Sequence, residues 1–184
     1  MSTASLVAWG LWLAIVAQRL VELRVAKRNE AWAREQGAVE HGAGHYPLLF
    51  VLHTGWLLAW PVEAWLHGPT LASGWIAGLC AFGLTQILRY WAITSLGLRW
   101  NTRILVLPGA ARIRRGPYRF VPHPNYLAVV IELAVVPLIF EAWWTAAIVG
   151  VLNLALLLGV RIPAEVRALE HAESVGASRA TTGS

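Results

Sequence analysis

Apolar residues along the chain gather into five long runs, separated by polar and basic segments. The runs cover Leu6–Val25, Tyr46–Trp65, Gly74–Ile93, Asn125–Phe140 and Trp143–Val160. A helix of about 20 apolar residues crosses the hydrocarbon layer of a bilayer and satisfies its own backbone there. The last two runs are shorter, and only Glu141 and Ala142 separate them, which predicts a helical hairpin. The pattern predicts an all-α integral membrane protein with about five transmembrane helices.

Composition agrees with this interpretation. Hydrophobic residues make up 57% of the 184 residues, charged residues 14%, and the mean hydropathy is +0.54. Soluble domains average roughly 45–50% apolar and about 25% charged residues. The N-terminus lacks the basic region that precedes a cleaved signal peptide, so the first run is expected to be a membrane span. We expect a single membrane domain over residues 1–173 and a disordered tail over residues 174–184, which is small, polar and without apolar periodicity.

The fifteen lysines and arginines follow the first, third and fifth apolar runs or lie near the ends of those runs. They are Arg19, Arg24, Lys27, Arg28, Arg34, Arg89, Arg99, Arg103, Arg112, Arg114, Arg115, Arg119, Arg161, Arg167 and Arg179. The alternate loops, 61–73 and 141–142, contain none. Cytoplasmic loops carry such an excess, so the N-terminus is expected outside and the C-terminus in the cytoplasm. Membrane lipids, and not nucleic acid, are then the expected partners of these charges.

A long segment that is not a predicted helix, Trp100–Phe120, connects the third and fourth runs. Its alternating Ile, Val and Leu residues are broken by Pro108 and Gly109, which predicts a short hairpin or a pair of extended arms on the membrane face. Long structured loops often carry function. The alternative is a solvated basic loop.

His123 stands between two prolines at the start of the fourth run. Pro124 suits the first position of a helix, where the N–H that it lacks would be unpaired. The amides of Asn125, Tyr126 and Leu127 are then expected to be free, and with the helix dipole they could hold a carboxylate or phosphate. The alternative is a membrane helix that His123 simply caps.

Three further residues are candidates for chemistry. Arg161 and Glu165 are four apart, so on one helix face they could pair or jointly grip a ligand, although Pro163 indicates a break or a fresh helix start. Glu132 lies near the middle of the fourth run, where an acid is costly. It could face a substrate, or it could pair with a residue such as Asn153 or Gln86. The spacing of His41, His45 and His53 is a weak metal pattern, and no metal is expected.

The motifs GPYRFVPHPNYLAVVIE, LGLRWNTRILVLPG, RIPAE and RLVELRVAKRNEAWAREQGAVEHGAGHYP resemble the isoprenylcysteine carboxyl methyltransferase family, in particular its bacterial branch. The resemblance extends to about Leu169. It implies a bacterial plasma-membrane enzyme that takes S-adenosylmethionine from the cytoplasm and methylates an oxygen of a lipophilic small molecule. Alkylpyrones and alkylresorcinols are the expected acceptors, or an isoprenylcysteine-like carboxylate.

The resemblance also implies a cytoplasmic cofactor pocket formed by the loop before the fourth helix, that helix and the end of the fifth. Its expected cofactor residues are Ala110, Ala111, Arg112, Ile113, Tyr118, His123, Pro124, Asn125, Tyr126 and Glu165. Arg161 and Glu165 are the expected catalytic residues, and Arg161 and Glu132 are expected to bind substrate. The chain departs from the family at Pro122, where an arginine is usual, and at Val166, where a second glutamate is usual.

Two other functions are compatible with the motifs. The HPNY element also occurs in membrane reductases of the sterol type, which use NADPH. A small transport or scaffold subunit would need no catalytic residues, but its polar residues should be distributed along a path across the bilayer. Here they concentrate at one set of span ends, with Glu132 the main exception.

Overall fold

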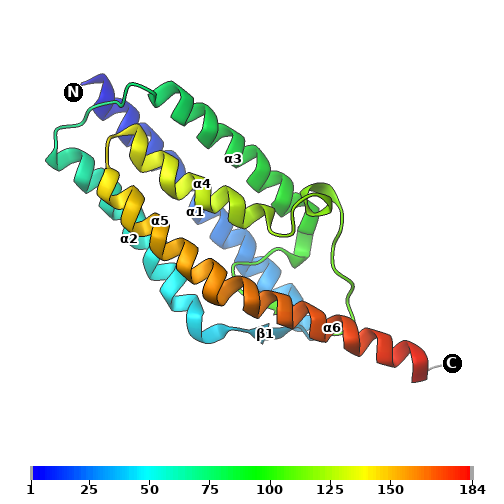
Figure 1. Ribbon diagram of the computed structural model, residues 1–184. Coiled ribbons are helices and arrows are strands. Elements are labelled where there is room, and N and C mark those ends of the chain that lie inside the picture. Colours follow the sequence, from blue (N-terminus) through cyan, green and yellow to red (C-terminus); the bar gives the residue numbers. More distant parts are fainter. Residues whose placement is uncertain (1, 183–184) are drawn as a thin grey trace.

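The computed structural model describes residues 2–182 as a bundle of helices with one small sheet (Figure 1). The helices are α1 (Thr3–Glu35), α2 (Tyr46–Leu66), α3 (Trp75–Leu96), α4 (Pro124–Ile139), α5 (Trp143–Leu156) and α6 (Ile162–Thr182). The strands are β1 (Val39–His41) and β2 (Ile104–Val106). Short helical turns are η1 (Ala43–His45), η2 (Gly97–Arg99), η3 (Gly116–Arg119) and η4 (Leu157–Arg161). The predicted helices are all present, and the two strands are an addition to the all-α prediction.

Four helical stretches are long and apolar enough to cross a membrane: Thr3–Glu35, Ala43–Leu66, Trp75–Arg99 and Trp143–Ala177. α4 has 16 residues, a length of about 24 Å at the usual rise, which is short of a hydrocarbon layer of about 30 Å. α4 lies between α3 and α5 (Figure 1), so neighbouring helices cover it. The structure therefore has four candidate spans, and the fourth of the five predicted spans is a shorter apolar helix inside the bundle.

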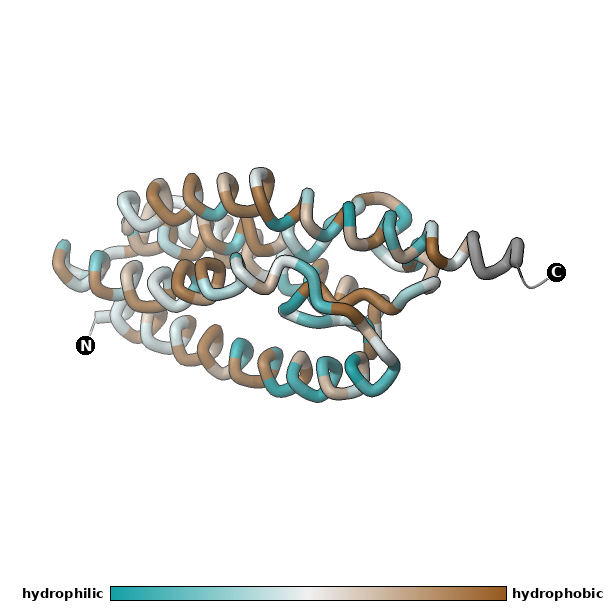
Figure 2. Tube along the Cα trace, turned by 90° about the horizontal axis from the view of Figure 1, so that it is seen from below, coloured by the Kyte–Doolittle hydropathy of each residue, from teal (hydrophilic) through white to brown (hydrophobic). Residues whose placement is uncertain are grey.

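The core lies in the half of the bundle away from the charged loops. Trp60 stacks on Phe140 with ring centroids 5.1 Å apart, and the Trp56 indole N–H donates to the Leu133 carbonyl at 3.1 Å. Most remaining apolar side chains point outward, and Figure 2 shows hydrophobic residues along the outer turns of the helices. An apolar exterior around a small core is the pattern of a helix bundle solvated by lipid. The chain is an integral membrane protein.

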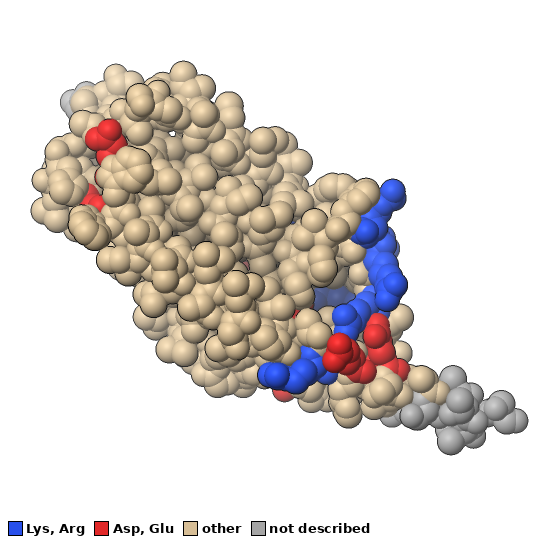
Figure 3. Space-filling model, viewed as in Figure 1, with Lys and Arg blue, Asp and Glu red and all other residues tan. Residues whose placement is uncertain are grey.

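Charged side chains collect at the opposite end of the molecule, around the loop before α4 and along α6 (Figure 3). At the apolar end, Glu63 accepts hydrogen bonds from the backbone N–H groups of Trp144 (2.9 Å) and Thr145 (2.8 Å), which caps α5. The bundle therefore has one charged end and one end with few charges.

The loop before α4 does not fold back on itself. β2 pairs antiparallel with β1, with Val39 opposite Val106 and His41 opposite Ile104. Of the two predicted forms, the hairpin is wrong, because β2 finds its partner in the segment that follows α1; an extended arm is present at Ile104–Val106. Glu40, at the middle of β1, binds Arg34 and Arg103, each at 2.6 Å. The hydrogen bond from Arg34 and the neighbouring Arg103 hold the pKa of Glu40 below its ordinary value.

After β2 the loop is fastened to α6. The N–H of Gly109 donates to the Ala172 carbonyl at 3.0 Å. Gly109 has a left-handed backbone (φ 81°) and lies against Gly176. A Cβ atom at position 176 would lie 3.0 Å from backbone atoms of Gly109, so the close approach needs glycine there. Ala168 and Ala172 also pack on Ile104 and Val106. These contacts reach Gly176. α6 is helical as far as Thr182, within the segment 174–184 that the sequence predicted to be a disordered tail; residues 183 and 184 lie outside the described part.

Candidate functional site

A cavity of about 760 Å³ opens between the helices at the charged end and extends into the bundle. This volume is typical of small-molecule sites, which measure about 300–1,000 Å³. The predicted site residues that line it are Ala110, Ala111, Arg112, Ile113, Tyr118, His123, Asn125, Tyr126, Glu132, Arg161 and Glu165. Pro124 is fully buried and is not among the lining residues. The structure thus brings the loop before α4, α4 itself and the η4–α6 segment to one cavity.

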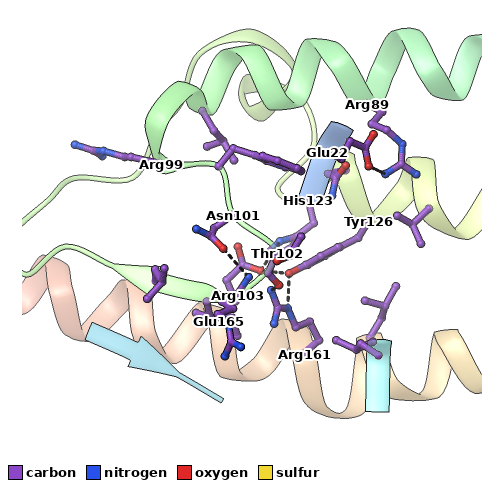
Figure 4. A pocket seen from close by; sticks show the side chains of 18 of the residues that line it. Glu22, Arg89, Arg99, Asn101, Thr102, Arg103, His123, Tyr126, Arg161 and Glu165 are labelled. Carbon is purple, nitrogen blue, oxygen red and sulfur yellow. Dashed lines mark hydrogen bonds and ion pairs between the residues drawn. The ribbon is translucent and has the colours of Figure 1, made fainter. Parts of the chain in front are cut away.

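Arg161, Tyr126 and Glu165 form a hydrogen-bonded chain at the outer part of the cavity, the mouth cluster (Figure 4). Arg161 Nε donates to the Tyr126 hydroxyl at 2.9 Å, and that hydroxyl donates to Glu165 Oε2 at 2.5 Å. Arg161 also donates to the Thr102 carbonyl at 2.8 Å. Arg161 and Glu165 share a helix face as their spacing predicts, but the tyrosine of α4 connects them.

His123 joins the mouth cluster from the N-terminal end of α4. Its ring stacks on Tyr126 with centroids 5.3 Å apart, and its Nδ1 lies 3.8 Å from Glu165 Oε2. Both contacts to Glu165 use Oε2, so Oε1 carries no hydrogen bond within residues 2–182. A half-buried carboxylate with one free oxygen suits a cationic donor such as an ammonium group.

The three α4 amides expected to be free are mostly occupied. The N–H groups of Tyr126 and Leu127 both donate to the His123 carbonyl, at 3.1 and 3.2 Å. Of the three, only the Asn125 N–H has no hydrogen bond in the described residues. The prediction of a three-amide anion site is therefore wrong. Arginines on the cavity wall, namely Arg99, Arg103, Arg112, Arg114 and Arg119, provide positive charge there instead.

Arg161 owes its position to an irregular helical turn. α5, η4 and α6 form one continuous rod (Figure 1), and η4 is a π-helical turn that ends at Arg161. Pro163 follows two residues later and cannot donate a backbone hydrogen bond. The wider π turn accommodates this loss without a break, and such turns are frequent at functional sites. Of the two predicted alternatives at Pro163, the break is absent, and the fresh helix start is confirmed because α6 begins at Ile162.

The loop between β2 and η3 makes another wall of the cavity. Arg99 donates to the Ala111 carbonyl at 2.9 Å, and Arg112 lies 3.4 Å from Glu173 and 3.8 Å from Glu170. Tyr118 in η3 is partly buried, and burial together with the Glu165 carboxylate raises its pKa above the ordinary value. Its hydroxyl is therefore protonated and can donate to a ligand.

Glu132 belongs to a different cluster, deeper in the bundle, which we call the buried ionic layer. The side chain is fully buried, and its two carboxylate oxygens bind Arg19 and Arg89 separately. Arg19 also binds Glu22 at 2.6 Å. The alternative partners, Gln86 and Asn153, form no hydrogen bond with Glu132 in the described residues; Gln86 accepts from Gln18 at 2.6 Å. Since Glu132 also lines the cavity, its role in substrate binding stays a prediction.

Arg19 and Arg89 lie inside the bundle, and not at its charged end as the loop assignment implied. Arg89 is only 3% exposed. The spacing of polar residues in the sequence could have predicted this. Gln18 and Glu22 are four apart in α1, and Gln86 and Arg89 are three apart in α3. Polar residues at helical spacing within apolar runs indicate a shared buried face.

Other lining residues were missed because nothing in their local sequence marks them. Thr102 and Arg103 follow η2, and Arg103 lies over the Tyr46 ring at 4.4 Å. Asn29 of α1 fixes this segment by donating to the Trp100 carbonyl at 2.8 Å and to the Gly97 carbonyl at 3.2 Å. The motif near the start of the chain therefore supports the cavity wall. Within the described residues, no three His, Cys, Asp or Glu side chains gather as a metal site would require.

The fold and the site define a helical membrane protein with a cavity lined by both ionic and apolar residues. Residues 76–171 match the isoprenylcysteine carboxyl methyltransferase family. The chain belongs to this family, whose members are membrane methyltransferases.

Two relatives cover most of the chain. The Bacillus subtilis (strain 168) protein described as "Uncharacterized protein YpbQ" is 40% identical over 163 residues, which is 89% of this chain and 96% of the relative. A Haemophilus influenzae (strain ATCC 51907 / DSM 11121 / KW20 / Rd) "Uncharacterized protein" is 30% identical over 158 residues, 85% of this chain and 91% of the relative. No solved structure matches the chain significantly.

Proposed function

We propose that the protein is an S-adenosylmethionine-dependent O-methyltransferase that acts on a lipophilic acceptor at the cytoplasmic face of the bacterial plasma membrane. The observation that carries this proposal is the mouth cluster: an arginine and a half-buried glutamate connected by Tyr126, at the outer part of a cavity that continues into the apolar bundle. The concentration of arginines at this end supports a cytoplasmic location, with the N-terminus outside.

The residues at the mouth fit the charged groups of S-adenosylmethionine. Glu165 has a free oxygen for its ammonium group. Arg112 and the other wall arginines suit its carboxylate, and the aromatic ring of Tyr126 suits a sulfonium. Asn125 Oδ1 is a buried acceptor without a partner, so it can receive a hydrogen bond from the nucleoside. When bound, the cofactor supplies an activated methyl group.

The acceptor is expected to reach the cavity from the lipid. Leu23 of α1 and Phe50 of α2 line the cavity, and these apolar side chains are 41% and 53% exposed. An alkyl chain can lie along such a surface while its polar head enters the cavity. Long-chain alkylpyrones and alkylresorcinols have this form, as does an isoprenylcysteine-like carboxylate.

In the reaction, a bond forms between the acceptor oxygen and the methyl carbon while the methyl–sulfur bond breaks. The protein contributes by aligning the two partners and by excluding water. Arg161 orients an acceptor oxygen that arrives ionised, through its charge. An acceptor that arrives protonated must lose its proton, and Glu165 and His123 are the nearby groups that can receive it.

A methyl-transfer assay tests the proposal. Purified protein in lipid, methyl-labelled S-adenosylmethionine and a long-chain alkyl hydroxypyrone should yield a labelled methyl ether, and Arg161→Ala should reduce the yield strongly. NADPH binding without S-adenosylmethionine binding would favour the reductase alternative. Full cellular function of the His123→Ala, Glu165→Ala double variant would favour a non-enzymatic subunit.

A further inference from the structure

Asn153 of α5 lines the cavity, and its side chain has no hydrogen-bond partner within residues 2–182. Its side chain is 0% exposed, and both the amide nitrogen and the amide oxygen are unpaired. Leaving such a group buried and unpaired costs about 1–3 kcal/mol. A buried side chain with this cost is expected to have a function in the ligand-bound protein.

Other polar side chains inside the bundle have partners, in contrast to Asn153. Glu132 has an arginine for each carboxylate oxygen, and the Gln18 amide donates to Gln86 at 2.6 Å and to Glu22 at 2.9 Å. Asn153 takes part in none of these contacts. Its donor and its acceptor therefore remain available to whatever enters the cavity.

His53 of α2 supplies a second available group on the same cavity. Its Nδ1 lies 2.7 Å from the Leu49 carbonyl, and because a carbonyl only accepts, Nδ1 carries the hydrogen. In the neutral ring, Nε2 then presents a lone pair. His53 lines the cavity and contacts no other polar group through Nε2 in the described residues. It can accept a hydrogen bond from a ligand hydroxyl.

The position of Asn153 relative to the mouth determines which part of a ligand it meets. Asn153 precedes Arg161 by eight residues, about 12 Å along the helix. Arg161 and Glu165 lie together in Figure 4, whereas Arg89 of the buried ionic layer lies apart from them. α5 begins at the end with few charges, where Glu63 caps it, and runs toward Arg161. Asn153 is therefore on the membrane side of the mouth cluster, toward the region that receives the acceptor.

We propose that Asn153, assisted by His53, binds a second oxygen of the acceptor's head group, separate from the oxygen that is methylated. This inference rests on the proposed function and adds the substrate class: lipids whose head group carries at least two hydrogen-bonding oxygens. An acceptor with a single oxygen leaves Asn153 unpaired in the complex and binds more weakly.

A matched pair of acceptors tests this site. A long-chain alkylresorcinol has two hydroxyl groups, and the alkylphenol with the same chain has one. The wild-type protein should have a KM about tenfold lower for the resorcinol, the effect of one hydrogen bond. Asn153→Leu should remove this preference by raising the KM for the resorcinol alone, with kcat little changed. Equal KM values in the wild type, or a preference that persists in Asn153→Leu, would overturn the proposal.

Thermal unfolding of the ligand-free protein is an independent readout. Asn153→Leu should raise Tm, because it removes unpaired polar atoms from the bundle. Asn29→Leu is the matched control and should lower Tm, because Asn29 is buried and donates two hydrogen bonds. A lower Tm for Asn153→Leu would make Asn153 structural and overturn the site. Failure of the proposed function can be told apart from failure of the Asn153 site. If the proposed function is wrong, S-adenosylmethionine raises the Tm of neither the wild type nor Asn153→Leu.

Discussion

The mouth cluster and the buried ionic layer use the same residue types in opposite ways. In the buried ionic layer, Arg19 and Arg89 occupy both oxygens of Glu132, which is fully buried. In the mouth cluster, the Glu165 side chain is 28% exposed and is contacted at one oxygen only. Arg161 reaches Glu165 only through Tyr126.

This difference in pairing distinguishes a carboxylate that stabilises the fold from one that can bind a ligand. A buried carboxylate must be neutralised by the protein itself, and once both oxygens are paired it has little capacity left for a ligand. A carboxylate at the edge of water can keep a free oxygen, because solvent screens it when the site is empty. Glu132 is thus expected to support folding, and Glu165 to support binding and catalysis.

The largest expected effect comes from the buried ionic layer. Glu132→Gln leaves Glu22 as the one acid beside Arg19 and Arg89, so the buried ionic layer carries an uncompensated positive charge. Breaking a buried pair costs about 3–5 kcal/mol of unfolding free energy. Folded yield and Tm in lipid or detergent should fall sharply. Glu35→Gln, at an exposed position, is the control and should behave as the wild type. If Glu132→Gln kept its stability but lost activity, Glu132 would belong to the substrate site.

Glu165→Gln should have the converse effect, with folding preserved and binding lost. The glutamine can still accept from Tyr126, but it lacks the charge that holds an ammonium group. Hydrogen bonds to charged groups contribute about 1.5–3 kcal/mol, so the Kd for S-adenosylmethionine should rise about 10- to 100-fold. Calorimetric titration measures this change. An unchanged Kd would remove Glu165 from the cofactor site.

Tyr126→Phe should produce a smaller loss. The ring that stacks on His123 remains, but the hydroxyl between Arg161 and Glu165 is removed. One such hydrogen bond contributes about 1 kcal/mol, so kcat/KM should fall about five- to tenfold. Tyr90→Phe, at an exposed position on α3, is the matched control. Equal activities of the two variants would show that the connection through Tyr126 has no catalytic importance.

The smallest effect is expected at the sheet. The pKa of Glu40 is lower in the folded protein, so its ion pairs stabilise the fold above the ordinary carboxyl pKa and are lost as pH falls through the lowered value. Because the pairs are near the surface, Glu40→Gln should cost below about 1 kcal/mol at neutral pH. The difference in Tm between variant and wild type should shrink toward acidic pH. A constant difference across pH would mean that packing, and not charge, is responsible.

The sequence predicted the helices well, because lipid requires apolar runs of a set length. It did not predict that β2 pairs with β1, since strands of three residues carry little pattern and their pairing joins distant segments. The helical course of α6 beyond residue 174 was missed for a similar reason. Contacts such as that of Gly109 with Gly176 lie between segments and not within them.

At the site, the spacing of residues along the sequence predicted which side chains share a helix face, but it did not predict their partners on other helices. The four-residue spacing of Arg161 and Glu165 indicated a shared face, but the intervening Tyr126 belongs to another helix. Glu132 was recognised as a costly residue in the middle of an apolar run. Its partners were missed, because counting charges by loop assigned Arg19 and Arg89 to the charged end of the bundle.

The central claim, that the methyl donor is held between the loop before α4, α4 and α6, can be tested by protection from alkylation. Ala111 is exposed, lines the cavity and can be replaced by cysteine after the chain's sole cysteine is removed by Cys80→Ser. S-adenosylmethionine should slow alkylation of the Ala111→Cys variant and leave a Glu35→Cys control unaffected. Equal alkylation rates at Ala111→Cys with and without saturating S-adenosylmethionine would contradict the account.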